Sequence, residues 1–265
     1  MASTADPSCL VVTGAASGIG AALASRLVAA GRRVIGVDRT AAMPAGVEPV
    51  TCDVTDPAAV ADALDTIAAR SPAGTVDGLA AVAGVPGTAA ADVVYAVNLL
   101  GLRRFTEALL PRIADGGSIV LLSSMAGYRG AATGEDAAAL LALPDGALLQ
   151  RLQDHGLDGP AAYQLSKQLV QRYALELAAR MHPRGVRCVS VSPGPVQTPI
   201  LNDFRTTMPT LDAAERLVGR HARPDEIAAV VAFALSPEAS WLNGVDLRLD
   251  GGLTALRSTP SAAVV

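Results

Sequence analysis

The sequence predicts a doubly wound α/β fold, in which a seven-stranded parallel sheet carries helices on both faces. Short apolar runs alternate with helical patterns along most of the chain. The runs are mostly continuous, which is typical of strands buried on both sides. In addition, the first run leads through a glycine-rich turn into a helix. Right-handed crossovers would place the carboxyl ends of all strands at one edge, where ligands bind in such folds.

Composition narrows the class of protein. The chain has 265 residues, of which 51% are hydrophobic and 17% charged, so it can form one core and a single domain over residues 1–265. A net charge of −4 without a basic run argues against a nucleic-acid partner. The first eight residues contain no Lys or Arg, and the longest apolar run, residues 227–235, is too short to span a bilayer. We therefore expect a cytoplasmic protein with no membrane partner.

The first predicted strand, residues 9–13, ends in a turn with the spacing Gly14-x3-Gly18-x-Gly20, and a helix over residues 21–30 follows. Gly14 can adopt a positive φ, while Gly18 and Gly20 lack a Cβ that would keep a ligand away. The free N–H groups at the helix start would hold a pyrophosphate, and Ser17 and Ile19 belong to the same predicted site. A glycine-rich turn that binds nothing is the alternative.

The second predicted strand, residues 33–37, ends at Asp38, 24 positions after Gly14. An acidic residue at this point accepts hydrogen bonds from the adenosine ribose and would repel a 2′-phosphate, which favours NAD over NADP. Arg39 could instead bind that phosphate, so we include both residues in the predicted cofactor site. The alternative is that Asp38 is only a solvated loop residue.

The other predicted elements continue the alternation of strands and helices. In chain order they are strand 49–52 before Asp53, helix 57–70, strand 78–83 before Gly84, helix 91–113, strand 118–122, helix 161–181, strand 186–191, helix 224–235 and strand 245–249. Residues 257–265 are small and polar and are expected to be loose. Cys9, Cys52 and Cys188 are widely spaced in apolar surroundings, which predicts buried free thiols.

Tyr163 and Lys167 stand four positions apart in a predicted helix and so share one face of it. A cation near a phenol favours the phenolate, which would lower the pKa of Tyr163 from about 10 towards a value suited to proton transfer. This predicts a general acid/base. Tyr and Lys at this spacing also occur by chance on many helices.

Together these residues resemble the short-chain dehydrogenase/reductase family, over about residues 9–253. The matching motifs are Thr13-Gly14-x3-Gly18-x-Gly20, Asp53-Val54, Asn98, Ser123-Ser124, Tyr163-x3-Lys167, Pro193-Gly194 and Asp250-Gly251-Gly252. Residues 81–84 read Ala-Val-Ala-Gly where the family usually has Asn-Asn-Ala-Gly. That departure removes the Asn side chains that support the central strand, so it affects stability more than catalysis.

The resemblance implies a role for each matching residue. Tyr163 would be the acid/base, Lys167 would lower its pKa and hold the nicotinamide ribose, and Ser124 would bind the substrate oxygen. Asn98 would link Lys167 to solvent through water, while Ser123 would be structural. The other residues that would contact the cofactor are Asp53 and Val54 at the adenine, Ala83, Gly84, Pro193, Gly194, Val196, and Thr198 at the carboxamide. The histidines, His155, His182 and His221, are scattered, so no metal site is expected.

An extra segment, about residues 127–160, separates Ser124 from Tyr163. The bacterial 3α-hydroxysteroid dehydrogenase/carbonyl reductase subgroup has a similar insertion. Helical patterns over residues 137–143 and 146–153 carry apolar stripes made of Leu140, Leu141, Leu148, Leu149 and Leu152. Because these stripes need a partner surface, we predict a homodimer with the insertion at or against the interface, and a tetramer as the second choice.

The segment at about residues 195–221 is the predicted substrate loop. Its apolar residues are Ile200, Leu201, Phe204, Met208 and Leu211, which read equally as a lid or as packing residues. The sequence thus predicts an NAD-dependent oxidoreductase that interconverts a secondary alcohol and a ketone on an apolar, cyclic or steroid-like molecule. A catalytically silent NAD-binding regulatory or scaffold protein is the alternative, and the intact Ser124, Tyr163 and Lys167 weigh against it. An epimerase or dehydratase on a nucleotide sugar usually needs a longer substrate domain.

Overall fold

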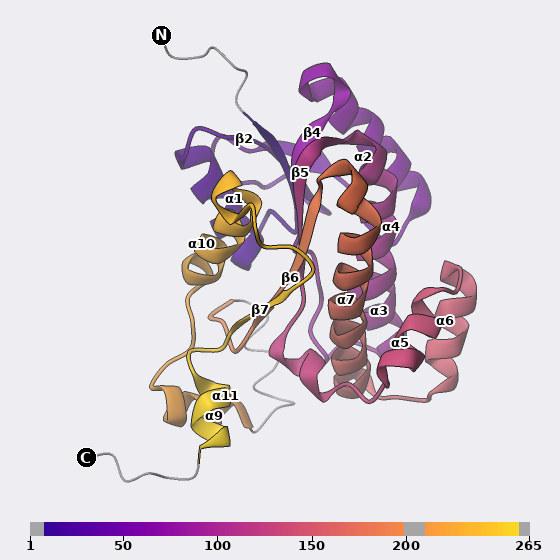
Figure 1. The fold of residues 1–265 in the computed structure, drawn as a ribbon, viewed down its shortest axis with the longest axis vertical. Coiled ribbons are helices and arrows are strands. Elements are labelled where there is room, and N and C mark those ends of the chain that lie inside the picture. The colour runs from indigo at the N-terminus through magenta and orange to yellow at the C-terminus, as the bar shows by residue number, and fades with distance from the viewer. Residues whose placement is uncertain (1–7, 199–209, 260–265) are drawn as a thin grey trace.

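A computed structural model describes residues 8–198 and 210–259, and only the backbone of residues 210–213. Seven parallel strands form one sheet in the order β3-β2-β1-β4-β5-β6-β7, with helices on both faces (Figure 1). This confirms the predicted fold. The strands are β1 (Cys9–Thr13), β2 (Arg33–Asp38), β3 (Glu48–Thr51), β4 (Val76–Ala81), β5 (Ile113–Leu122), β6 (Arg187–Pro193) and β7 (Asp246–Leu249).

The helices form a layer on each side of the sheet (Figure 1). Helices α1 (Gly18–Ala29) and α10 (Pro224–Leu235) pack together on one face over a core that includes Val12 and Leu23. The larger core, on the other face, includes Leu79 and Phe105. Its helices are α2 (Pro57–Arg70), α3 (Ala91–Tyr95), α4 (Leu102–Leu109) and α7 (Gly159–Met181).

The strand order reverses between β1 and β4. From β1 the chain moves outward to β2 and β3, and then returns to place β4 on the other side of β1, where Val11 pairs with Ile35 on one side and Leu79 on the other. The crossovers that follow β1 and β4 therefore lead to helices on opposite faces of the sheet and leave a crevice beyond its carboxyl edge. This position defines where a ligand can enter the fold.

Strand β4 ends at Ala81, two residues before its predicted end. The N–H groups of Val82 and Ala83 donate to the side-chain hydroxyl of Thr13, at 3.1 and 3.2 Å, in place of a backbone carbonyl of a neighbouring strand. Thr13, at the end of β1, thus fastens the segment in which the sequence lacks the family's two Asn side chains.

The predicted helix over residues 91–113 is wrong in two respects. Helix α3 passes into a π-helical turn, η2 (Ala96–Gly101), before α4 begins. After the short turn η3 (Leu110–Arg112), Ile113 already belongs to β5 and pairs with Val76, so the strand starts five residues earlier than predicted. The register shifts after Val76, and Gly116 follows in β5 with φ +77°.

The insertion forms two helices, α5 (Gly134–Leu141) and α6 (Asp145–Asp154), close to their predicted positions. Its leucines contradict the reason given for a dimer, because Leu148 and Leu152 are 0% exposed within the single chain and Leu140 is also buried. They extend the core formed by α3, α4 and α7. The stripes therefore already have a partner surface, and the homodimer stays a prediction without this support.

A buried arginine holds the insertion on the body of the protein. The Arg103 guanidinium, on α4, donates to the carbonyls of Leu141 and Leu143 at the end of α5, and pairs with Asp145 at the start of α6. Arg104 binds the second oxygen of Asp145 at 3.0 Å. One helix thus fixes both insertion helices through their connecting loop.

The C-terminal part differs slightly from expectation. Arg257 and Ser258, predicted in the loose tail, end helix α11 (Leu253–Ser258), while residues 260–265 lie outside the described residues. In the substrate loop, helix α9 (Thr210–Val218) is present. The predicted lid residues Ile200, Leu201, Phe204 and Met208, and the side chain of Leu211, are likewise outside the description.

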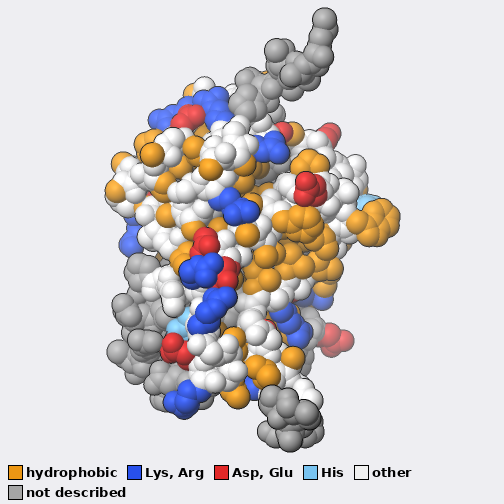
Figure 2. Space-filling model, turned by 90° about the vertical axis from the view of Figure 1, so that its left-hand side faces the viewer, with side chains coloured by type: hydrophobic (Ala, Val, Ile, Leu, Met, Phe, Trp, Pro, Cys, Tyr) orange, Lys and Arg blue, Asp and Glu red, His pale blue; other side chains and the backbone are white. Residues whose placement is uncertain are grey.

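The three cysteines are buried free thiols, as predicted. On the face of α1 and α10, Figure 2 shows basic and acidic side chains beside a group of adjoining hydrophobic side chains. Across the described ranges, no helix has the length and apolar character needed to cross a bilayer.

Candidate active site

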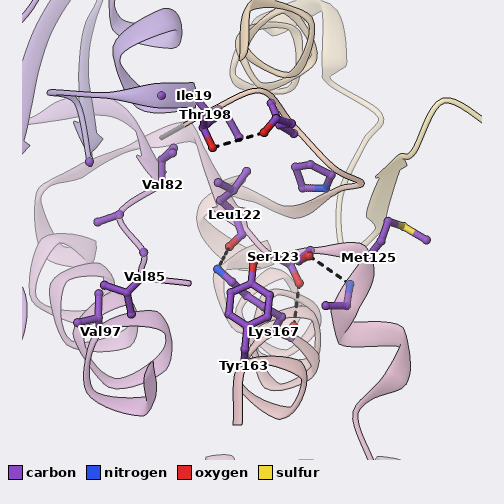
Figure 3. A pocket seen from close by; sticks show the side chains of 18 of the residues that line it. Ile19, Val82, Val85, Val97, Leu122, Ser123, Met125, Tyr163, Lys167 and Thr198 are labelled. Carbon is purple, nitrogen blue, oxygen red and sulfur yellow. Dashed lines mark hydrogen bonds between the residues drawn. The ribbon is translucent and has the colours of Figure 1, made fainter. Parts of the chain in front are cut away.

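A cavity of about 760 Å³ lies at the crevice between the loops that follow β1 and β4. All of the predicted cofactor-binding residues line it, together with Ser124, Tyr163 and Lys167. Figure 3 places Tyr163 and Lys167 beside Ser123, with Val82, Val85 and Val97 on one side and Met125 on the other. Asn98 is the predicted site residue that does not reach the cavity wall.

The floor of the cavity is the glycine-rich turn. Gly14 has φ +71°, and a Cβ there would lie 2.8 Å from Cα of Ala83, so the loops after β1 and β4 touch through backbone alone. Ser17 precedes α1, whose first N–H groups, from Gly18 onward, have no intrahelical acceptor. Together with the helix dipole they form an anion-binding end that faces the cavity.

Carboxylates line the far end of the cavity. One oxygen of Asp38, at the end of β2, accepts the N–H of Ala16 at 3.2 Å and so lies against the glycine-rich turn. Hydrogen bonds from Thr55, and to a lesser extent the charge of Arg39, lower the pKa of Asp53.

Ser124, Tyr163 and Lys167 meet at the other end. Ser124 follows β5, and its hydroxyl is hydrogen-bonded to that of Tyr163, from the first turns of α7. The Lys167 ammonium donates to the Leu122 carbonyl at 2.9 Å and lies 5.7 Å from the centroid of the Tyr163 ring (Figure 3). Ser123 donates to the Lys167 carbonyl at 2.8 Å and thereby fastens α7 to the end of β5.

Burial governs the ionisation of this pair. It raises the pKa of Tyr163, against a smaller lowering by the Ser124 hydrogen bond, and it lowers the pKa of Lys167 to about 8. In the protein on its own, the shift of the Tyr163 pKa thus has the opposite direction to the one expected from Lys167, whose effect on Tyr163 stays a prediction. Desolvation disfavours the phenolate more than the cation, itself desolvated, can favour it.

Asn98 occupies a place behind the cavity. Its amide is fully buried in η2, where Oδ1 accepts the N–H of Val85 at 2.8 Å and Nδ2 donates to the carbonyl of the same residue at 3.0 Å. A Cβ on Gly84 would lie 3.1 Å from Asn98 Oδ1 and 3.8 Å from Lys167 Nζ. Asn98 thus holds the backbone of Val85, which lines the cavity, and the water link to Lys167 stays a prediction.

The turn after β6 covers the glycine-rich turn. The Gly194 N–H donates to Leu249 at 2.9 Å, and Val196 forms a bridge with Ala222. A Cβ on Gly18 would lie 3.3 Å from Cγ2 of Thr198, and Figure 3 places Thr198 beside Ile19. The predicted carboxamide-binding residue is therefore next to the helix end that would hold the pyrophosphate.

Comparison with known proteins supports the same interpretation. The family described as short chain dehydrogenase matches residues 8–136, and the one described as enoyl-(acyl carrier protein) reductase matches residues 151–254. Coniferyl-alcohol dehydrogenase of Pseudomonas sp. (strain HR199 / DSM 7063) is 36% identical over 93% of this chain and 96% of its own. The chain belongs to the short-chain dehydrogenase family.

Two further relatives are named for 3-alpha-hydroxysteroid dehydrogenase, the subgroup in which the sequence predicts a similar insertion. The 3-alpha-hydroxysteroid dehydrogenase/carbonyl reductase of Comamonas testosteroni is 31% identical over 94% of this chain and 97% of its own. The crystal structure of the 3-alpha-hydroxysteroid dehydrogenase from Pseudomonas sp. B-0831, complexed with NADH, superposes with a TM-score of 0.81 at 32% identity, covering 95% of this chain and 98% of that one. This short-chain dehydrogenase is thus an oxidoreductase whose relatives act on alcohol or carbonyl groups.

Sequence reasoning missed part of the apolar lining of the cavity in this short-chain dehydrogenase. Val85, Val93, Val97, Met125 and Tyr128 line it, and Figure 3 places Val85 and Val97 on the opposite side of Tyr163 from Met125. Met125 and Tyr128 belong to a 3-10 turn, η4 (Met125–Arg129), which Ser124 caps by accepting the Ala126 N–H. Their closeness to Ser124 in the chain was a usable signal, whereas Val97 reaches the site from the π-helical turn, which the sequence pattern did not reveal.

Proposed function

We propose that this protein is an NAD-dependent dehydrogenase that interconverts a secondary alcohol and a ketone on an apolar, cyclic or steroid-like molecule. The observation that carries the proposal is the convergence of Ser124, Tyr163 and Lys167 in a cavity that continues to Asp38. A proton-transfer end and a nucleotide-binding end in one continuous cavity fit a dinucleotide that bridges them.

The residues present fit a nicotinamide dinucleotide. The start of α1 offers unpaired N–H groups for the pyrophosphate, and Asp38 offers a carboxylate for the ribose. When bound, the nicotinamide supplies the hydride acceptor or donor. Tyr163 then exchanges a proton with the substrate oxygen, Ser124 hydrogen-bonds that oxygen, and Lys167 holds the adjoining ribose.

The substrate end supports an apolar molecule. Val85, Val97 and Met125 line the cavity and lie on either side of Tyr163 (Figure 3). The relatives named for hydroxysteroids and the relative named for coniferyl alcohol are all consistent with a ring-bearing substrate.

The cofactor assignment is tested by calorimetric titration of NADH and NADPH into the wild-type protein. NADH should bind more tightly, and Asp38→Ala should lose that preference because the repulsion of a 2′-phosphate disappears. Asp62→Ala removes an exposed carboxylate of α2 outside the cavity and serves as the control. Tighter binding of NADPH by the wild type would overturn the assignment.

The substrate class is tested by following NAD reduction with a 3α-hydroxysteroid, a hydroxycyclohexane carboxylate, coniferyl alcohol and an open-chain polyol. The proposal expects the largest kcat/KM for a ring-bearing secondary alcohol. Preference for the polyol would contradict the apolar class. Tight NAD binding without turnover of any alcohol or ketone would favour a silent NAD-binding regulator or scaffold.

A further inference from the structure

Two sets of hydrogen bonds connect a carboxylate on the edge strand of the sheet to the turn η4 beside Ser124. Asp246 opens β7 and pairs in register with Ser190 of β6. Its Oδ2 accepts the Tyr128 hydroxyl at 2.6 Å, and its Oδ1 accepts the hydroxyls of Ser190 and Ser192 at 2.6 and 2.8 Å. Both serines are buried, so this acceptor is built into the sheet.

The first set of hydrogen bonds leads to the far end of η4. Tyr128 lies near the end of this turn and lines the cavity, and its ring lies under the Arg248 guanidinium, 3.8 Å from the centroid. Asp246 and Arg248, both from β7, thus hold the hydroxyl and the face of one cavity-lining ring. The ring's place in the wall depends on contacts with the edge strand.

The second set of hydrogen bonds leads to the near end of η4. The hydroxyl of Ser192, which donates to Asp246, accepts from Nε2 of Gln171 at 3.0 Å, and the same Nε2 donates to the carbonyl of Ser124 at 3.3 Å. The carbonyl of Ser124 also accepts the Gly127 N–H, at 2.9 Å. Hydrogen bonds through Ser192 and Gln171 therefore connect Asp246 to the carbonyl of Ser124, the residue that caps η4.

Between its two ends, η4 orients the hydroxyl of Ser124. The Ala126 N–H donates to Ser124 Oγ at 3.1 Å, which leaves the hydroxyl hydrogen to point elsewhere, towards Tyr163 and the cavity. The turn already touches α7, because a Cβ on Gly127 would lie 2.9 Å from the backbone of Lys167 and Gln168. It therefore cannot move closer to α7, and the Tyr128–Asp246 hydrogen bond ties its far end to β7.

We propose that Asp246 is a positioning residue that fixes both ends of η4 and so orients Ser124 and holds the Tyr128 wall of the substrate site. The inference rests on the proposed role of Ser124 in catalysis. Each carboxylate oxygen serves one end of the turn, so an amide at this position, with a single acceptor oxygen, leaves one end without its acceptor.

The test compares Asp246→Asn, Tyr128→Phe and Ser192→Ala with the matched control Ser190→Ala. Ser190 donates to the same carboxylate oxygen as Ser192 but has no bond to Gln171. We expect kcat/KM for the preferred alcohol to fall about tenfold or more in Asp246→Asn, since small displacements of a positioned group cost this much or more. Tyr128→Phe and Ser192→Ala, which each affect one end of η4, should lose less of their kcat/KM. Ser190→Ala should keep a kcat/KM within about twofold of wild type, although its Tm should fall by about as much as that of Ser192→Ala. NADH affinity should not change in any of them.

Hydrogen exchange gives a readout that does not depend on turnover. The amides of Ala126 and Gly127 should exchange faster in Asp246→Asn, Tyr128→Phe and Ser192→Ala than in wild type. In Ser190→Ala their exchange rates should equal those of wild type. If no alcohol is turned over by wild type, the proposed function fails and exchange still decides the anchoring. Unchanged exchange in Asp246→Asn, or equal effects of Ser190→Ala and Ser192→Ala on activity, would overturn the positioning role.

Discussion

Tyr163 and Lys167 are four residues apart, yet burial moves their pKa values in opposite directions, up for the phenol and down to about 8 for the ammonium. Each shift favours the neutral form. For proton transfer, the protonated phenol is the form that gives a proton to a ketone, and the phenolate is the form that takes one from an alcohol. The sign of the shift on Tyr163 therefore sets the pH dependence of each direction.

We expect kcat/KM for alcohol oxidation to rise with pH through the alkaline range, because the raised pKa of Tyr163 keeps the phenolate scarce near neutrality. Ketone reduction should be steady at lower pH, where the phenol is protonated, and fall only as the phenol ionises. Tyr163→Phe should lose roughly 10²–10⁴-fold in kcat in both directions and lose the slope, while NAD binding persists. Initial rates at several pH values, with calorimetry for NAD, measure all three.

Tyr173→Phe is the matched control for this experiment. Tyr173 lies on the same helix, and its hydroxyl donates to Glu107 at 2.7 Å, away from the cavity. Its turnover should resemble wild type. Near wild-type turnover in Tyr163→Phe, or flat profiles in both directions for the wild type, would mean that another group transfers the proton.

For single residues, the sequence predicted where the site residues lie better than it predicted the direction of the Tyr163 pKa shift. Gly14, Asp38, Ser124, Tyr163 and Lys167 could be placed at one edge because each follows a strand or shares a helix face. The direction of the Tyr163 shift depends on how completely neighbouring segments exclude water, which spacing along one helix does not contain.

Among the elements, the insertion shows how two helices are held by one side chain. The Arg103 side chain is 10% exposed and occupied by two carbonyls and a carboxylate. Removing it would leave the carbonyls of the partly buried Leu141 and Leu143 without this donor, and Asp145 with Arg104 alone, which costs more than the bonds themselves contribute.

Arg103→Met should therefore reduce the free energy of unfolding by about 2–5 kcal/mol. Arg112→Met is the control, because Arg112 makes one long contact of 3.7 Å with an exposed Asp65 and should change stability by about 0–1 kcal/mol. Urea unfolding followed by circular dichroism compares the two. Equal losses would show that Arg103 does not fasten the insertion.

The elements also mark where sequence patterns stop being informative. Helical periodicity found the insertion helices to within a few residues, but it could not reveal η2, because one wider turn leaves the polar and apolar pattern almost unchanged. That turn turns Asn98 inward onto Val85. Arg103 was equally hidden, since an arginine on an amphipathic helix normally predicts a solvated position.

For the molecule as a whole, the insertion enlarges the core on one face of the sheet. Leu148 is 0% exposed within the chain, so Leu148→Ala should reduce the free energy of unfolding by about 2–5 kcal/mol through lost contacts and a cavity. Leu149→Ala, at a partly buried neighbouring site, should cost less. Urea titrations of both variants give the difference.

The predicted homodimer is measured separately, by light scattering of the wild type. Folded Leu148→Ala should form an assembly with the same number of subunits as the wild type, because the Leu148 side chain packs on its own chain. Dissociation of that variant without loss of stability would instead place Leu148 at a subunit interface.

The reactivity of the three buried cysteines can report how fast individual strands of the sheet open. Burial raises the pKa of Cys9, Cys52 and Cys188, that of Cys52 to about 11. At pH 7 a thiol of that pKa is ionised in only about one molecule in 10⁴. Because the thiolate is the reactive species, a thiol reagent should modify the native protein only as each strand opens. Cys9 lies in β1, Cys188 in β6, and Cys52 directly after β3, so the rates of labelling at these sites would time the opening of the centre and both flanks of the sheet.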